Sequence, residues 1–210
     1  MIGVLHNTGL VYVFTGEGKG KTSAALGVAT RALLIGKRVI WVAFYKGRDW
    51  ELAEKKLSEK FSNLEMYFTG RGFRISTPVD QRVSKSVDQL AGKPVKIAKI
   101  AGERVVVDTA SEEEHREAAE EGLQQAENSL QQKPFLLAMD EVLNAVSEGL
   151  VESKRVMELL SKRGTTHIVL TGRVNERARR LLREADLVTE CKKVKHPYDT
   201  GKLAVRGLDY

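Results

Sequence analysis

The densest group of residues that could do chemistry is the run Thr15-Gly16-Glu17-Gly18-Lys19-Gly20-Lys21-Thr22 near the N-terminus. Glycines lack a Cβ, so successive backbone N–H groups can converge on phosphate oxygens. Lys21 adds a full positive charge, and the Thr22 hydroxyl can bind a magnesium ion. The form Gly-x4-Gly-Lys-Ser/Thr would place glycine at position 15, but here the glycine follows one residue later. Such a cluster can be an ordinary turn; between a strand and a helix it predicts a phosphate-binding loop.

Two adjacent carboxylates, Asp140 and Glu141, follow an apolar run at residues 135–139. In proteins with such a loop, a second strand presents an acid that holds the metal directly or through water. By itself the pair is typical of a helix N-cap and a first-turn acid. With the glycine loop upstream, we interpret it as part of a magnesium site. Arg173 follows another predicted strand and is equally well a phosphate contact or an ordinary loop arginine.

The sequence shows no pattern that is typical of other catalytic chemistry. The four histidines, at positions 6, 115, 167 and 196, show no metal-ligand spacing, and Cys191 has no recognisable base beside it. One cysteine cannot form an internal disulfide, which suits a reducing compartment. We therefore expect neither a zinc site nor a nucleophilic triad.

Short apolar runs alternate with helical patterns along the chain. In the first helix, Ala24, Ala25, Val28, Ala32 and Leu33 recur at three- and four-residue steps up to Gly36. Strands are predicted at residues 10–14, 38–44, 64–68, 135–139, 166–170 and 187–189, and further helices at 112–131, 153–162 and 175–183. This order predicts an α/β fold of the P-loop NTPase type, a mostly parallel sheet with helices on both faces.

One stretch breaks this alternation. Residues 93–100 and 103–109 are rich in Val, Ile and Lys, and Ala101-Gly102 separates them. The pattern predicts a β-hairpin, inserted at about residues 75–111 into a single domain that spans residues 1–210.

The amino-acid composition and net charge limit the class of protein to which this chain can belong. Of the 210 residues, 42% are hydrophobic and 30% charged, which excludes a mainly disordered or fibrous chain. The net charge of +6 leaves nucleic acid, membrane and phosphorylated small molecules open as anionic partners. Residues 162–206 hold twelve Lys or Arg against five Asp or Glu, which a solvated helix face would also explain. No apolar stretch is long enough to span a bilayer and no signal peptide is recognisable, so we expect a cytoplasmic protein without a membrane partner.

Several motifs together resemble the P-loop corrinoid adenosyltransferases, the ATP:cob(I)alamin or cob(I)yrinic acid a,c-diamide adenosyltransferase family. The resemblance covers residues 10–73 and about 112–210. It rests on the residues Gly16-Glu17-Gly18-Lys19-Gly20-Lys21-Thr22, Arg31, Met139-Asp140-Glu141, Thr171-Gly172-Arg173, Val194-Lys195-His196-Pro197-Tyr198-Asp199, Gly201 and Arg206-Gly207-Leu208-Asp209-Tyr210.

The resemblance implies transfer of the 5′-deoxyadenosyl group of ATP to the Co(I) centre of a corrinoid, with release of triphosphate, in cobalamin biosynthesis. Co(I) is itself a strong nucleophile, which agrees with the missing triad. ATP and a reduced corrinoid are the implied substrates, Mg²⁺ or Mn²⁺ the implied metal, a reductase or flavoprotein the implied electron donor, and a homodimer the implied assembly.

The resemblance also assigns residues. Lys21 and Glu141 are the expected catalytic residues, and Thr22, Glu141 and Asp140 the expected metal site. Phe73 is expected to contact the corrinoid, although Ile75 stands where the family commonly has tryptophan. The expected nucleotide-binding residues are Gly16, Glu17, Gly18, Lys19, Gly20, Lys21, Thr22, Ser23, Arg31 and Arg173.

The sequence is also compatible with two other functions. One is a P-loop ATPase that binds nucleic acid through its basic C-terminal third, although aromatic residues do not alternate with the arginines there as single-strand stacking would require. The other is a corrinoid or nucleotide carrier that binds without turnover.

Overall fold

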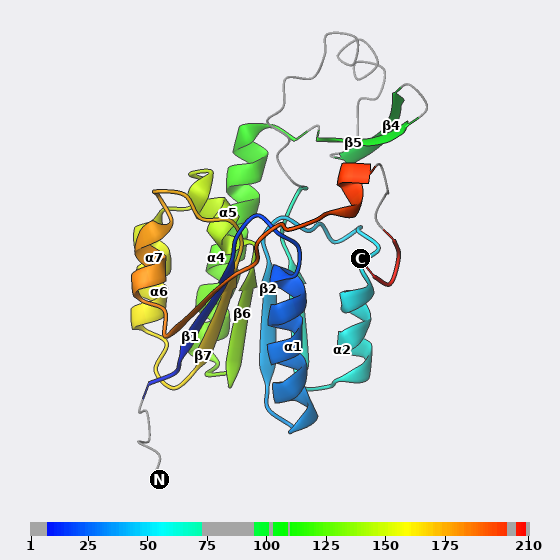
Figure 1. The fold of residues 1–210 in the computed structure, drawn as a ribbon. Coiled ribbons are helices and arrows are strands. Elements are labelled where there is room, and N and C mark those ends of the chain that lie inside the picture. The colour runs from blue at the N-terminus through cyan, green and yellow to red at the C-terminus, as the bar shows by residue number, and fades with distance from the viewer. Residues whose placement is uncertain (1–7, 73–94, 101–102, 109, 201–204, 209–210) are drawn as a thin grey trace.

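The computed structural model describes residues 8–72, 95–100, 103–108, 110–200 and 205–208. Six parallel strands form one sheet in the order β3-β2-β6-β7-β1-β8 (Figure 1). The strands are β1 (Val11–Thr15), β2 (Val39–Ala43), β3 (Leu64–Phe68), β6 (Leu136–Asp140), β7 (His167–Thr171) and β8 (Leu187–Glu190). The predicted α/β fold of the P-loop NTPase type is confirmed.

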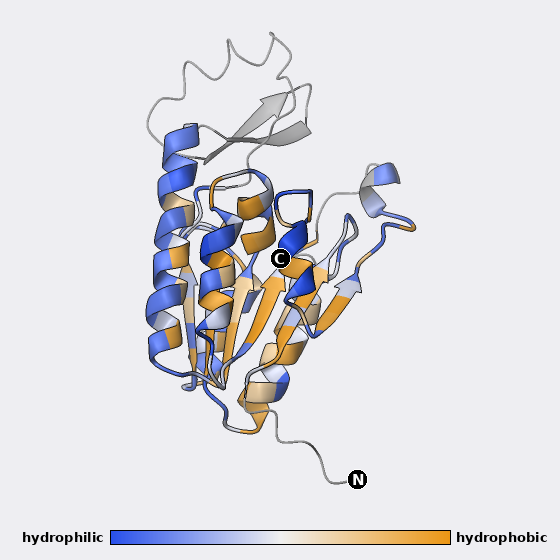
Figure 2. Ribbon diagram, turned by 90° about the vertical axis from the view of Figure 1, so that its left-hand side faces the viewer, coloured by the Kyte–Doolittle hydropathy of each residue, from blue (hydrophilic) through white to orange (hydrophobic). Residues whose placement is uncertain are grey.

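Helices cover both faces of this sheet. Among the described residues, the helices are α1 (Lys21–Leu34), η1 (Ala53–Lys56), α2 (Leu57–Lys60), α4 (Glu112–Gln131), α5 (Val142–Ser147), α6 (Ser153–Ser161), α7 (Arg179–Arg183) and η3 (Pro197–Thr200). On one face, α1 packs on Val39, Trp41 and Ala43 of β2. On the other face, Ile40 and Val42 lie in a core cluster that also holds apolar residues of α4, α5, α6 and α7. Strands covered on both faces are apolar throughout, which explains their unbroken apolar runs (Figure 2).

The predicted strands and the first three predicted helices match the structure to within a residue or two at most ends, and α4 matches at both ends. Helix α4 begins at a capping box, in which Ser111 accepts a hydrogen bond from the backbone of Glu114 and the Glu114 side chain accepts one from the backbone of Ser111. The sequence reasoning missed η1, α2, α5 and η3, which are only four to six residues long.

One predicted helix was too long. The helix expected at residues 175–183 begins only at Arg179. The Asn175 side chain accepts a hydrogen bond from the backbone N–H of Arg177 (2.9 Å) and donates one to the carbonyl of Ser147 (2.8 Å). An asparagine that bonds its own backbone two residues on forms a turn, so the chain enters the helix late.

The predicted hairpin strands are present as a separate antiparallel pair, β4 (Val95–Ile100) and β5 (Glu103–Asp108). Their register runs from Val95 opposite Asp108 to Ile100 opposite Glu103. The preceding part of the predicted insertion, residues 75–94, lies outside the described residues. Among the residues that the structure does describe, no helix combines the length and hydrophobicity needed to cross a bilayer.

Two mid-helix glycines provide a test of this packing. A Cβ added to Gly27 of α1 would meet open space, whereas a Cβ on Gly122 of α4 would lie 2.7 Å from Thr69 Oγ1 and 3.0 Å from the Phe44 ring. We expect Gly27→Ala to stabilise the protein by about 0.5–1 kcal/mol through helix propensity. Gly122→Ala should destabilise it by about 1–3 kcal/mol through overpacking. Urea titration measures both. A Gly122→Ala variant at least as stable as the parent would contradict the close contact of α4 with Thr69 and Phe44, and a destabilised Gly27→Ala would contradict the open space beside Gly27.

Candidate active site

The glycine run forms the connection between β1 and α1 and lies against the chain that follows β8. Gly16 and Gly20 adopt left-handed backbone angles, with φ of 103° and 112°. The backbone N–H of Gly18 donates to the carbonyl of Cys191, and the N–H of Cys191 donates to that of Thr15, both at 2.7 Å. A Cβ on Gly16 would lie 2.5 Å from the Cys191 oxygen, and one on Gly18 would lie 2.7 Å from it. Glycine is therefore needed here for close backbone approach as well as for its backbone angles.

Lys21 lies buried at the start of α1 and closes the loop on itself. Its Nζ donates to the carbonyls of Gly16 and Gly18, both at 2.9 Å. No side chain caps the N-terminus of α1, and its first turn holds no acidic residue. The N-terminal N–H groups and the positive end of the helix dipole are therefore directed at the loop, an arrangement that suits a phosphate.

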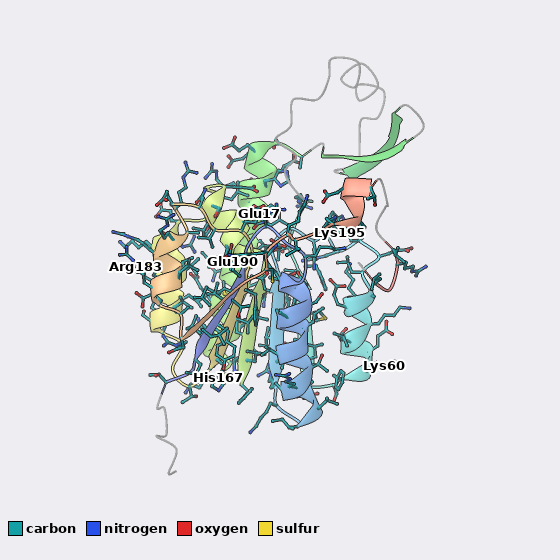
Figure 3. The ribbon with its side chains drawn as sticks, viewed as in Figure 1. Glu17, Lys60, His167, Arg183, Glu190 and Lys195 are labelled. Atoms are coloured by element: carbon teal, nitrogen blue, oxygen red, sulfur yellow. The ribbon has the colours of Figure 1, made fainter. Side chains whose placement is uncertain are left out.

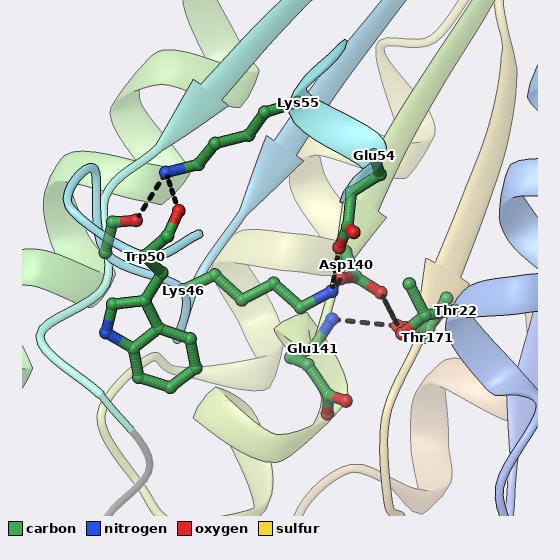
Figure 4. A network of polar contacts seen from close by, with 9 residues as sticks. Thr22, Lys46, Trp50, Glu54, Lys55, Asp140, Glu141 and Thr171 are labelled. Atoms are coloured by element: carbon green, nitrogen blue, oxygen red, sulfur yellow. Dashed lines mark hydrogen bonds and ion pairs between the residues drawn. The ribbon is translucent and has the colours of Figure 1, made fainter. Parts of the chain in front are cut away.

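Asp140, the last residue of β6, is the centre of a buried polar network (Figure 4). Its Oδ1 accepts hydrogen bonds from the hydroxyls of Thr22 (3.0 Å) and Thr171 (2.7 Å). Its Oδ2 lies 2.9 Å from Nζ of Lys46 in an ion pair. Strand β7 separates β6 from β1, so Thr171 at the end of β7 fills the space between the loop and the acids.

Glu141 differs from its neighbour in both backbone and side chain. Its φ of 64° and ψ of 13° are left-handed, and its backbone N–H donates to Thr171 Oγ1 at 2.8 Å. Its side chain is buried, and Oε2 has no hydrogen-bond partner among the described residues. Burial, and next the charge of Asp140, raise the pKa of Glu141 to about 7. A strained backbone that buries an unpartnered carboxylate is a feature typical of functional sites.

Arg173 reaches the loop from the end of β7. Its guanidinium lies 2.7 Å from a carboxylate oxygen of Glu17 in an exposed ion pair. The residue is held by α5, because its N–H donates to the side chain of Asn144 and its carbonyl accepts from Ser147. Gly172 permits this approach, since a Cβ there would lie 2.8 Å from Asn144.

Lys46 is a site residue that the sequence reasoning missed. It follows β2 by three residues, and its buried Nζ lies 2.9 Å from both Asp140 Oδ2 and Glu54 Oε1. Burial alone would lower the pKa of Lys46, but the charges of Asp140 and Glu54 outweigh it and raise that pKa. The only signal in the sequence is a single lysine after an apolar strand. Its importance depends on β2 pairing with β6, which places Ala43 opposite Asp140.

The structure does not bring every expected residue to this site. Arg31 lies exposed in the last turn of α1, ten residues after Lys21 and so roughly 15 Å away along the helix axis. Ser23 is exposed on the first turn of α1. Phe73, the expected corrinoid contact, lies outside the described residues.

His167, a residue of the sheet, has a structural role. His167 begins β7, at the end of the sheet opposite Glu17 (Figure 3). Its Nδ1 accepts a hydrogen bond from the backbone N–H of Leu10 at 3.0 Å. This contact ties the start of β7 to the chain just before β1, far from the loop.

The oxygen atoms of Thr22 and Glu141 suit a magnesium ion that arrives with a phosphate, whereas Asp140, the third expected ligand, directs its oxygens at Thr22, Thr171 and Lys46. Within the described part of the chain, no group of three His, Cys, Asp or Glu side chains could hold a metal ion by itself. Mg²⁺ is usually bound by one or two carboxylates together with water and substrate phosphates. The unpartnered Oε2 of Glu141, which adjoins the acid that holds the Thr22 hydroxyl, fits such a shared site.

Comparison with known proteins gives one consistent result. The model of the family described as "ATP:corrinoid adenosyltransferase BtuR/CobO/CobP" matches residues 7–101 and 83–210. The corrinoid adenosyltransferase of Escherichia coli (strain K12) is 31% identical over 204 residues, which cover 96% of this chain and 86% of that protein. The corrinoid adenosyltransferase CobA of Salmonella typhimurium (strain LT2) is 30% identical over 203 residues, with the same two coverages.

A solved structure of a DNA replication initiation factor is also similar, at 12% identity and a TM-score of 0.35, over 89% of this chain and 40% of that one. A similarity this low carries no argument about function. The fold assignment depends on the strand order and the loop of this chain.

The raised pKa of Glu141 predicts a pH-dependent stability in the absence of metal and nucleotide. The folded carboxyl keeps its proton up to about pH 7, whereas the ordinary value is 4.5. As the pH rises through this window the unfolded chain releases a proton that the folded chain retains, so the parent loses free energy of unfolding. Glu141→Gln has no such loss.

We expect Glu141→Gln to gain stability over the parent between pH 5 and pH 8, by on the order of 3 kcal/mol. Urea titrations at the two pH values, with chelator present, measure the gain. The exposed Glu59→Gln on α2 serves as a control for general charge effects. An equal difference between Glu141→Gln and parent at both pH values would refute the raised pKa.

Proposed function

The chain belongs to the ATP:corrinoid adenosyltransferase family and is an ATP:corrinoid adenosyltransferase; from this premise, we propose that the loop and the acids at the ends of β1, β6 and β7 are its site for ATP and Mg²⁺. The observation that carries the proposal is the junction of Asp140 with Thr22. This bond joins the second residue of α1, directly after the glycine loop, to a buried acid that adjoins Glu141, whose Oε2 has no hydrogen-bond partner in the part of the chain that the structure describes.

The reaction transfers the 5′-deoxyadenosyl group of ATP to the cobalt of a reduced corrinoid. An electron pair on Co(I) forms the bond to C5′, and the bond from C5′ to the α-phosphate oxygen breaks. That oxygen keeps the bonding electrons and leaves as part of inorganic triphosphate. The nucleophile needs no activating base, so the protein's main task is to neutralise the charge that gathers on the leaving group and to hold the reactants in line.

The residues of the loop suit this task. Lys21 would exchange its two carbonyl partners, Gly16 and Gly18, for phosphate oxygens, and the uncapped N–H groups of α1 would donate to the same anion. Arg173, beside the loop, can add a further positive charge. Thr22 and Glu141 would hold Mg²⁺, which supplies positive charge to the phosphates when bound.

The neighbouring turn supports a corrinoid site next to the nucleotide. The backbone N–H of Gly70 donates to the carbonyl of Lys46 (3.2 Å), and that of Gly72 donates to the carbonyl of Tyr45 (3.0 Å). These bonds place the residue before Phe73 beside the chain that carries Lys46. We therefore propose that Phe73 contributes to the corrinoid side of the site.

The electron donor, the cellular compartment and the assembly of the enzyme are proposed from the family resemblance. A reductase or flavoprotein would supply the electron that gives Co(I), and the enzyme would work as a cytoplasmic homodimer. Nucleic acid is not proposed as a partner. Of the basic residues considered for that role, Arg173 and Arg179 each pair with a glutamate, Glu17 and Glu176.

The first test is turnover and its dependence on Lys21. The parent with ATP, Mg²⁺ and chemically reduced cobalamin should form adenosylcobalamin, followed by its absorption spectrum, and triphosphate. Lys21→Ala should lower the rate about 100-fold or more, because a charge on the leaving group loses its partner. The control Lys60→Ala removes an exposed lysine of α2 and should retain the parental rate. Formation of only ADP and phosphate by the parent would refute the proposed function.

A second test separates the two substrates. Phe73→Ala should raise the KM for the corrinoid by about tenfold, with little change in ATP binding, because loss of an aromatic contact affects only the substrate that it touches. Steady-state kinetics with each substrate varied in turn measure the effect. Equal losses for both substrates would place Phe73 elsewhere.

A further inference from the structure

Lys46 is a buried cation held between acids from two different elements. Asp140 ends β6 and Glu54 lies in η1, and each carboxylate has an oxygen 2.9 Å from Lys46 Nζ. The side chains of Lys46, Glu54 and Asp140 are 11%, 9% and 0% exposed, so all three charges are removed from water. In the proposed reaction, Lys46 makes no direct contact with the triphosphate.

Stability alone does not account for this cluster. Desolvation of a buried ion pair offsets much of its attraction, and apolar residues of similar volume often replace such pairs without loss of stability. What an apolar replacement could not do is orient a carboxylate. With Oδ2 of Asp140 on Lys46, Oδ1 is turned toward Thr22 and Thr171, from which it accepts two hydrogen bonds.

The orientation of Asp140 determines how Thr22 presents its oxygen. The Thr22 hydroxyl has one proton, and that proton is donated to Asp140. Its lone pairs are then left for a cation. If the Asp140 carboxylate turned away, it would no longer accept this hydrogen bond, and the Thr22 hydroxyl would be free to rotate.

The main chain of Lys46 is as firmly held as its side chain. Its carbonyl accepts from Gly70, and Gly70 packs so tightly that a Cβ there would lie 2.0 Å from the carbonyl carbon of Tyr45. The Lys46 backbone is therefore fixed, and its side chain extends from there to Asp140 and Glu54 (Figure 4).

We propose that Lys46 is a positioning residue of the enzyme, which acts through Asp140 to hold the Thr22 hydroxyl ready for the metal–nucleotide, with Glu54 holding Lys46 from the other side. This inference depends on the proposed function of the loop as the ATP and Mg²⁺ site. It assigns the segment after β2 a role in that site, although neither the glycine motif nor the acidic pair extends to it.

The neighbouring Lys55 provides a matched control. It is also a lysine of this segment, and its Nζ donates to the carbonyls of Gly47, Arg48 and Trp50; Figure 4 draws the bond to Trp50. These three bonds hold a loop and do not involve Asp140. Lys55→Met should lower the thermal midpoint without changing the Mg²⁺ dependence of nucleotide binding.

The test is a double-mutant cycle on Mg²⁺-dependent binding of the β,γ-imido analogue of ATP, followed by calorimetry without corrinoid. Lys46→Met and Thr22→Val should each raise the Mg²⁺ concentration for half-maximal binding at least tenfold. If Lys46 acts through Asp140 on Thr22, the double variant should be no worse than the poorer single variant. Multiplying effects, or an unchanged Mg²⁺ requirement in Lys46→Met, would overturn the proposal.

Glu54→Gln covers the case in which Lys46→Met does not fold. This variant retains the ion pair between Lys46 and Asp140 and weakens only the contact between Glu54 and Lys46. We therefore expect the Mg²⁺ concentration for half-maximal binding to rise roughly threefold, with no further rise when Glu54→Gln is combined with Thr22→Val. No rise in the single variant, or a further rise in the double variant, would overturn the proposal. If the variants show this coupling but the parent forms no adenosylcobalamin, the proposed function is refuted and the role of Lys46 is retained.

Discussion

The burial of the Asp140 carboxylate is the constraint on which the site depends. A charge removed from water must be paired and hydrogen-bonded, or it costs several kcal/mol. Asp140 meets this demand with one lysine and two hydroxyls, which come from the chain after β2, from α1 and from β7. Satisfying a single anion therefore fixes three elements against β6, and it sets the distance between the glycine loop and Glu141.

Asp140 and Glu141 show how adjacent carboxylates acquire different tasks. Oδ1 of Asp140 accepts two hydrogen bonds, and Oδ2, which has no hydrogen bond, forms an ion pair with Lys46. Glu141 is turned by its left-handed backbone into a position where Oε2 has no hydrogen-bond partner among the described residues. The pKa of Glu141 rises toward 7, which makes its carboxylate unfavourable until a cation arrives. The fold thus gives up stability at Glu141, which the proposed metal–nucleotide would restore on binding, as expected for a preorganised binding site.

Much of this could be predicted from the sequence, and the misses have physical causes. Strands buried on both faces and a capped helix such as α4 have strong local signals, so their positions were predicted closely. The loop and the acidic pair were found because glycine and carboxylate chemistry is visible in short motifs. Lys46 was missed because its role is created by pairing of distant strands. Arg31 carries a family motif, yet α1 places it at the end of the helix away from the loop.

The most direct test of this account is a crystal structure of the chain with Mg²⁺ and the β,γ-imido analogue of ATP. In that structure, Lys21 should leave the carbonyls of Gly16 and Gly18 for phosphate oxygens, and Thr22 and Glu141 should bind the metal. Asp140 should keep its bonds to Thr22, Thr171 and Lys46. A metal bound away from Glu141, or an Asp140 that has released Lys46 to bind the metal itself, would contradict the account.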